Sequence, residues 1–185
     1  MIGLILLALI VLAGLWAIAI FNGLVRRKNM VAEAWSGIDA QLKRRADLIP
    51  NLVDTVKGYA GHERETFEEL ARLRSQGQAS GDVAARGQTE LQIGAGLGRL
   101  MAVAEGYPQL RASETFQTLQ KDLAETEDQI QLARRYYNGT VREFNVKIEQ
   151  FPSNLVARFG GFKPAQFFQI ENDADRAVPK VALGT

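Results

Sequence analysis

The sequence lacks most of the side chains that enzyme chemistry requires. Its 185 residues include no cysteine and one histidine, His62. The sequence therefore has no thiol for thiol catalysis and too few cysteine and histidine ligands for a zinc cluster. A Ser-His-Asp triad could use only His62, and no G-x-S-x-G turn accompanies that histidine. The one cluster that an enzyme would use, His62 with Glu63 and Glu65, lies partly on different faces of a helix. We expect no enzymatic activity, no cofactor, no metal and no small-molecule substrate.

The sequence also lacks an excess of charge of either sign. Lysine and arginine total 22 against 21 aspartate and glutamate residues, a net charge of +1. A domain that binds nucleic acid carries a clear basic excess, so we expect no nucleic acid as a partner. The absence of cysteine fits a reducing and an oxidising compartment equally well.

A long apolar run near the start of the chain is the most informative feature that is present. Residues 2–21 carry no charge. As a helix they would be about 30 Å long, the thickness of the hydrocarbon core of a bilayer, with every backbone hydrogen bond satisfied internally. We predict one transmembrane anchor over residues 1–24, with the lipid bilayer as a partner. A cleaved signal peptide, with Ala17-Ile18-Ala19 as its cleavage site, is the alternative, but the run is long for one and no cation precedes it.

Three cations follow the apolar run directly. Arg26, Arg27 and Lys28 come after it, whereas no lysine or arginine comes before it. Positive charges remain on the cytoplasmic side of a membrane, so we predict a single-pass protein whose C-terminal domain is cytoplasmic.

The rest of the chain shows the apolar spacing of amphipathic helices. The first stripe consists of Val31, Trp35, Ile38 and Leu42. Only Gly23 separates this stripe from the apolar run, so we expect one continuous helix over residues 2–46. A second helix follows over residues 50–75, with Asp47 as its cap and Pro50 in its first turn.

The helical spacing of apolar residues nevertheless continues through Pro50 without interruption. The alternative to two helices joined by a turn is therefore a single helix kinked at this proline. We favour a turn because a rod of about 55 residues would outreach its partner helices and expose its stripe.

The remaining boundaries follow from turn and cap signals. Residues 75–82 are small and polar, which predicts a loop. We expect a third helix over residues 83–107, ended by Pro108, and a longer fourth helix over residues 114–151 with Ser113 as its N-cap. Residues 93–98, Ile-Gly-Ala-Gly-Leu-Gly, do not have the G-x-G-x-x-G spacing of a nucleotide loop, and we interpret them as small residues that let a neighbouring helix approach.

The predicted fold is all-α. A transmembrane helix continues into an antiparallel up-and-down four-helix bundle over residues 25–170, and a tail follows over residues 171–185.

The far end of the first helix is a candidate surface for a partner. Lys43, Arg44 and Arg45 lie about 35 Å beyond the apolar run, too far for attraction to lipids. They either bind a partner or pair with Asp39, Asp47 or Asp54, and Trp35 is either an anchor for that partner or a core residue. The candidate partner-binding residues are Trp35, Lys43, Arg44, Arg45 and Asp47.

The end of the fourth helix is a candidate membrane-interface region. This helix exceeds its neighbours in length and should reach back to the bilayer. Phenylalanines follow it beside Arg158 and Lys163, a combination that suits a membrane interface; the alternative is that the rings cap the core. The candidate membrane-interface residues are Arg26, Arg27, Lys28, Phe159, Phe162, Phe167 and Phe168.

Several segments together resemble the LemA family. They include Ala34-Trp-Ser-Gly-Ile-Asp39, Val103-Ala-Glu-Gly-Tyr-Pro108, Ala133-Arg-Arg-Tyr-Tyr-Asn138 and Phe151-Pro-Ser-Asn154. The resemblance covers residues 22–170. It implies a bacterial inner-membrane protein with one N-terminal anchor, a four-helix up-and-down domain and no catalytic residues. Some members of the family are associated with building membrane-bounded organelles.

Two functional hypotheses follow. The first is a non-catalytic scaffold that self-associates, or docks a membrane-protein partner, to organise the bacterial inner membrane. The second is a monomeric or dimeric adaptor or sensor for a membrane protease or an envelope-stress system.

Overall fold

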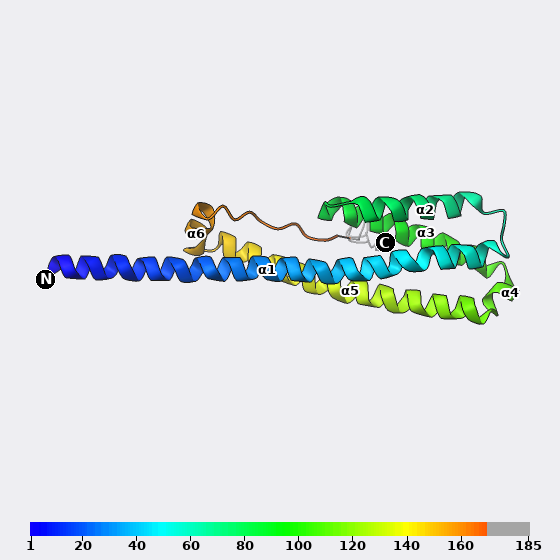
Figure 1. The fold of residues 1–185 in the computed structure, drawn as a ribbon, viewed down its shortest axis with the longest axis horizontal. Coiled ribbons are helices and arrows are strands. Elements are labelled where there is room, and N and C mark those ends of the chain that lie inside the picture. The colour runs from blue at the N-terminus through cyan, green and yellow to red at the C-terminus, as the bar shows by residue number, and fades with distance from the viewer. Residues whose placement is uncertain (170–185) are drawn as a thin grey trace, which may run out of the picture. The chain divides into compact units, whose positions relative to one another are not determined.

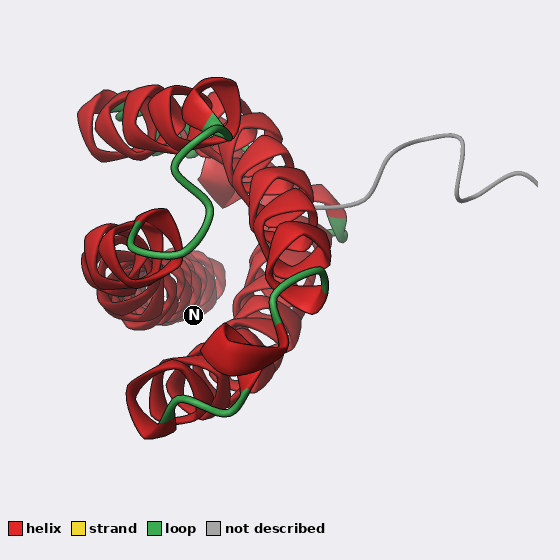
Figure 2. Ribbon diagram, turned by 90° about the vertical axis from the view of Figure 1, so that its right-hand side faces the viewer, coloured by secondary structure: helices red, strands yellow, loops and turns green. Residues whose placement is uncertain are grey.

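The computed structural model describes residues 1–169. Over these residues the regular structure is helical and contains no strand (Figure 2), which confirms the all-α prediction. The helices, labelled in Figure 1, are α1 (Ile2–Lys57), α2 (Arg64–Ala79), α3 (Val83–Glu105), α4 (Pro108–Arg111), α5 (Glu114–Glu149) and α6 (Ser153–Phe159). The tail predicted over residues 171–185 lies outside the described residues.

The predicted turn before Pro50 is wrong. α1 is one helix from Ile2 to Lys57 with Pro50 inside it, and the chain reverses over residues 58–63 instead. A proline inside a helix has no N–H to donate to the carbonyl four residues earlier, here that of Ala46. Nε of Arg74, on α2, donates to that Ala46 oxygen at 2.7 Å. A side chain from another helix thus replaces the missing backbone donor.

The boundaries of α3 and α5 lie close to their predicted positions, whereas α2 continues to Ala79 and includes most of the loop predicted over residues 75–82. α3 begins at Val83, where Oδ1 of Asp82 accepts a hydrogen bond from the backbone N–H of Ala85. α5 starts directly after Ser113, as expected. Pro108 opens the short helix α4, in addition to following the end of α3. The sequence did not predict α6.

The described chain divides into two compact units. The first comprises residues 1–44 and 124–167, and the second comprises residues 45–123 and 168–169. In the first unit α1 and α5 run antiparallel, because Arg27 contacts Glu143 whereas Trp35 contacts Tyr137.

The second unit has a hydrophobic core to which α1, α2, α3, α4 and α5 all contribute. Its largest fully buried side chains include Ile49, Leu52, Leu70, Leu73, Ile93, Leu100 and Leu110. α2 and α3 pack side by side and antiparallel (Figure 1). At Gly96 an added Cβ would lie 2.8 Å from Cδ2 of Leu70. The small residues of this segment therefore allow a close helix approach, as predicted.

Candidate functional site

The N-terminal part of α1 exposes apolar side chains around its whole circumference. Leu12 is 62% exposed and Trp16 is 53% exposed, and no part of the most apolar window is buried. A helix that is apolar on every face needs an apolar surrounding, and this one has the length and composition to cross a membrane. The part of the first unit next to residue 21 is therefore where a membrane surface would lie.

The chain that follows α6 returns to the end of this apolar run. Gly161 adopts φ 68°, a left-handed conformation that glycine accepts readily, and it ends α6. The N–H of Phe162 donates to the oxygen of Ala157 at 3.0 Å, and the N–H of Gly161 donates to the oxygen of Arg158 at 3.3 Å, as in a Schellman motif. This turn directs Phe162 onto Phe21, with 5.4 Å between ring centroids.

Two side chains of α5 hold the extended segment after Phe162. The amide of Asn145 donates to the oxygen of Ala165 at 2.9 Å and accepts from its N–H at 2.8 Å. The hydroxyl of Tyr137 donates to the oxygen of Gln166 at 2.8 Å. Burial raises the pKa of the Tyr137 hydroxyl, because the charged form would lose its hydration. The neutral phenol is therefore the form that bonds the segment.

A groove of about 440 Å³ lies between α1, α5 and this segment in the first unit. Aromatic and aliphatic side chains form its walls, and the two charged residues among those lining it are Lys28 and Lys163. Trp35 is one of these wall residues, and its ring packs on that of Tyr137 with centroids 5.4 Å apart. The groove is therefore apolar and carries positive charge.

The predicted membrane-interface residues lie in different environments. Phe159 is 93% exposed and Phe167 is 39% exposed, whereas Phe168 is completely buried in the second unit. Phe162 is half-buried against Phe21. Of the four predicted phenylalanines, Phe159 is thus the most exposed.

The predicted cations near the span are also divided. Arg26 and Lys28 are exposed. Nη1 of Arg27 lies 2.6 Å from Oε2 of Glu143, and both side chains are well exposed. A pair so accessible to water contributes little to stability, about 0–1 kcal/mol.

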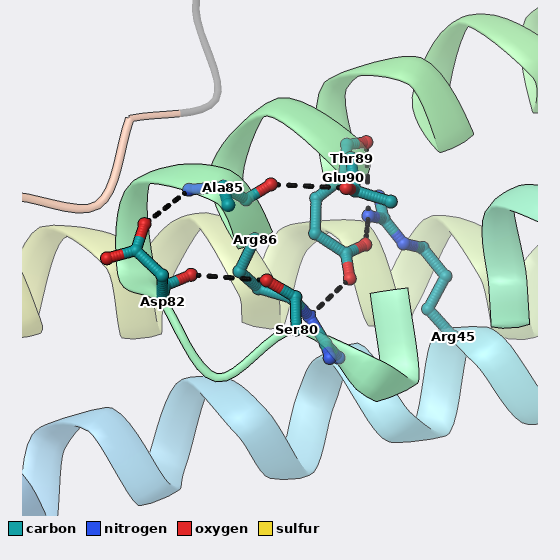
Figure 3. Close-up of polar contacts among 7 residues, drawn as sticks. All are labelled: Arg45, Ser80, Asp82, Ala85, Arg86, Thr89 and Glu90. Atoms are coloured by element: carbon teal, nitrogen blue, oxygen red, sulfur yellow. Dashed lines mark hydrogen bonds and ion pairs between the residues drawn. The ribbon is translucent and has the colours of Figure 1, made fainter. Parts of the chain in front are cut away.

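Arg45, one of the predicted partner-binding residues, is buried and not on the surface. Its guanidinium pairs with the carboxylate of Glu90, which also lies 2.8 Å from Nε of Arg86 (Figure 3). Relative side-chain exposures are 3%, 3% and 6% for Arg45, Glu90 and Arg86. The sequence considered only aspartates as partners of Arg45, whereas α3 supplies Glu90 as a buried one.

The other residues predicted at this end are more accessible. Lys43 and Arg44 are exposed. Oδ1 of Asp47 lies 3.7 Å from Nη2 of Arg74. Trp35 is half-buried in the first unit. The binding of a partner by these residues therefore remains a prediction.

Sequence reasoning missed several residues that shape these sites. Arg86 and Glu90 stand four residues apart on α3, a spacing that predicts an ion pair on one helix face. No local pattern indicates that the pair is buried against Arg45, or that Asn145 and Tyr137 bind residues far along the chain. Phe151, Leu155 and Phe159 also recur at intervals of four, a signal that could have revealed α6.

The helical fold and the exposed apolar run of α1 define a membrane-anchored helical protein. Residues 34–183 match the LemA family, and the chain belongs to that family. It is 34% identical to Protein LemA of Metamycoplasma hominis over 139 residues, which cover 74% of this chain and 63% of the relative. It is 27% identical to Magnetosome protein MamQ 2 of Paramagnetospirillum magneticum over 184 residues, covering 85% and 68%. Magnetosome protein MamQ of Magnetospirillum gryphiswaldense is 25% identical over the same shares.

Proposed function

We propose that this chain is a non-catalytic scaffold, held in the bacterial inner membrane by α1, that self-associates to organise the membrane around it. The observation that carries the proposal is the continuity of α1. The exposed apolar residues 2–21 and the buried Ile38 and Leu42 belong to one unbroken helix. A continuous helix fixes the orientation of one of its parts relative to the other. Association of copies through the domain would therefore also orient their membrane-spanning segments.

The arrangement of the scaffold extends this proposal. The cations at positions 26–28 favour a cytoplasmic C-terminal domain. The connections over residues 58–63 and 80–82 are short, and residues 106–113 between α3 and α5 contain only the four-residue helix α4. Such connections favour helices packed as an antiparallel up-and-down bundle.

An exposed stripe on α5 offers a surface for self-association. Leu132, Tyr136 and Val146 are 50%, 58% and 53% exposed. Helix geometry places them within an arc of about 80°. Large apolar side chains gathered on one face of a helix are typical of a surface that another protein covers. A second copy of this chain is the occupant that the scaffold requires.

The mass of the full-length protein in mild detergent, measured by size exclusion with light scattering, tests the scaffold. We expect a discrete assembly of many copies, and we expect replacing Leu132 and Tyr136 by serine to reduce its mass. Arg142→Ser, at an exposed position of α5 about 40° outside this arc, is the control and should leave the assembly intact. A monomer or a dimer would rule out the scaffold.

The groove favours a second function, that of a monomeric or dimeric adaptor or sensor for a membrane protease or an envelope-stress system. Its apolar walls with Lys28 and Lys163 suit an acidic segment with apolar side chains, supplied by a membrane-protein partner. Changing both lysines to glutamate should abolish co-purification of that partner without changing helix content. Arg26→Glu with Arg158→Glu makes the same change of charge outside the groove. Co-purification that survives the lysine changes would exclude the groove as the docking surface.

A further inference from the structure

We propose that α6 is a second membrane contact, which inserts Phe151, Leu155 and Phe159 into the interface of the leaflet at the end of the α1 span. This inference rests on the proposed anchoring by α1. It names a lipid-binding face that includes two residues outside the predicted interface set.

The exposed face of α6 is apolar and its opposite face is packed. Leu155 and Phe159, four residues apart on α6, are 53% and 93% exposed, and Phe151, two residues before the helix, is 74% exposed. Ser153 and Ala157, on the other side of the helix, are each 1% exposed. α6 is thus fixed to the first unit by small residues and turns its largest apolar side chains outward. Such a face needs an apolar surrounding to leave water.

Contacts within the first unit place α6 at the end of the span. At Gly160, directly after α6, an added Cβ would lie 3.0 Å from Cε2 of Phe21, the last residue of the apolar run. Before α6, Gln150 and Arg27 line the same open surface depression of about 430 Å³. Arg27 lies about 9 Å along α1 beyond Phe21. The helix therefore occupies the depth at which hydrocarbon gives way to headgroups, and Figure 1 shows it beside α1.

The charges around α6 complement a lipid surface. Residues 150–169 contain no aspartate or glutamate, whereas Arg158 and Lys163 are exposed there. Arg26 and Lys28 are exposed on α1 at a similar depth. Aromatic rings at the hydrocarbon boundary with cations among the headgroups are the usual composition of an interfacial contact. Continuity with the span makes the leaflet, and not a second protein, the occupant of this face.

Single cysteines test the proposal in the full-length chain, which contains none of its own. Leu155→Cys and Phe159→Cys are labelled with the fluorophore NBD in nanodiscs of phosphatidylcholine and phosphatidylglycerol at a ratio of three to one. Quenching by spin-labelled lipid is the readout, because a second protein copy does not cause it. Leu132→Cys, at a 50% exposed apolar residue of α5, is the matched control, and Leu12→Cys reports the span.

We expect at least twofold stronger lipid quenching at positions 155 and 159 than at position 132, and strong quenching at position 12. Replacing Phe151 and Phe159 by serine in the Leu155→Cys chain should lower its quenching at least twofold; both rings are exposed, so the fold is retained. Equal quenching at positions 155, 159 and 132 would overturn the α6 contact while position 12 still confirmed anchoring. Absent quenching at position 12 would overturn the anchoring and the α6 contact together.

Discussion

Nε of Arg74 donates a hydrogen bond at 2.7 Å to the carbonyl oxygen of Ala46, the acceptor that Pro50 leaves without its helical donor. The contact joins α2 to the interior of α1. Ala46 is 6% exposed, so water cannot easily replace the arginine. The uninterrupted course of α1 therefore depends on a residue that comes 28 positions later in the chain.

Arg74→Met should destabilise the protein by about 1–3 kcal/mol, because it leaves a buried carbonyl without a donor. In a Pro50→Ala background the restored backbone N–H can bond Ala46, so the same change should cost about 1 kcal/mol less. Denaturant unfolding followed by circular dichroism in detergent measures both values. Arg72→Met, at a residue that bonds Gln76 within α2, is the control. An equal loss in the two backgrounds would contradict this role for Arg74.

Glu90→Gln should be strongly destabilising, by about 3–5 kcal/mol, because two buried guanidinium groups would lose their shared counter-charge. Figure 3 shows this carboxylate between Arg45 and Arg86. The matched change is Glu69→Gln, at the partner of Arg99, where both side chains are more than a third exposed. We expect a loss of at most about 1 kcal/mol there. Similar free energies of unfolding for the two variants would contradict the larger contribution to stability that we expect from the buried ion pairs.

Tyr137→Phe should destabilise the protein by about 1 kcal/mol near pH 8, because the bond to the Gln166 oxygen is lost. The effect should depend on pH. Because the pKa of Tyr137 is raised above its ordinary value of 10.0 in the folded state, the folded protein holds this proton more tightly than the unfolded chain. The contribution of the hydroxyl is complete below pH 10 and declines as pH rises through the raised pKa.

The melting temperatures of the wild type and Tyr137→Phe should therefore keep their difference below pH 10 and converge as pH rises above 10. Tyr136→Phe, which alters the neighbouring and 58% exposed tyrosine, corrects for general alkaline effects. A wild-type advantage that stayed constant above pH 10 would argue against titration of Tyr137.

Gly96→Val should destabilise the protein by about 1–3 kcal/mol, because the new side chain would overlap Leu70 where α3 approaches α2. Gly98→Ala serves as the contrasting change. An added Cβ there meets nothing within 4 Å, so the better helix propensity of alanine should stabilise by about 0.5–1 kcal/mol. Thermal unfolding by circular dichroism compares the two. If Gly96→Val left the stability unchanged, α2 and α3 could move apart there without a loss of stability, and the close approach at Gly96 would not matter.

Local patterns predicted much of the helical structure. The third and fourth helices were expected within a few residues of α3 and α5, because the 3.6-residue apolar period, the small polar residues before Val83 and the N-cap signal of Ser113 are properties of neighbouring residues. The same local rules failed at Pro50. Proline is unfavourable inside an isolated helix, and the donor that satisfies the Ala46 carbonyl, the guanidinium of Arg74, comes from another helix.

The candidate sites depended more on tertiary contacts. The phenylalanines after the fourth helix were recognised as one group, yet Phe159 is exposed and Phe168 is buried. Composition alone cannot separate them, because burial depends on which surfaces reach each ring. The same holds for the cations at positions 43–45. Arg45 is buried because it pairs with Glu90, 45 positions away, and composition alone could not distinguish it from the exposed Lys43 and Arg44.

The sequence by itself determined that this protein is helical and that its first helix is long and apolar enough to cross a membrane. Helix propensity, apolar period and run length act over a few neighbouring residues, so the linear chain carries them in full. The tertiary structure alone decided that α1 passes through Pro50, that Arg45 is buried and that α6 lies against Phe21. Each of these outcomes requires atoms from distant parts of the chain, which meet only after the helices have packed.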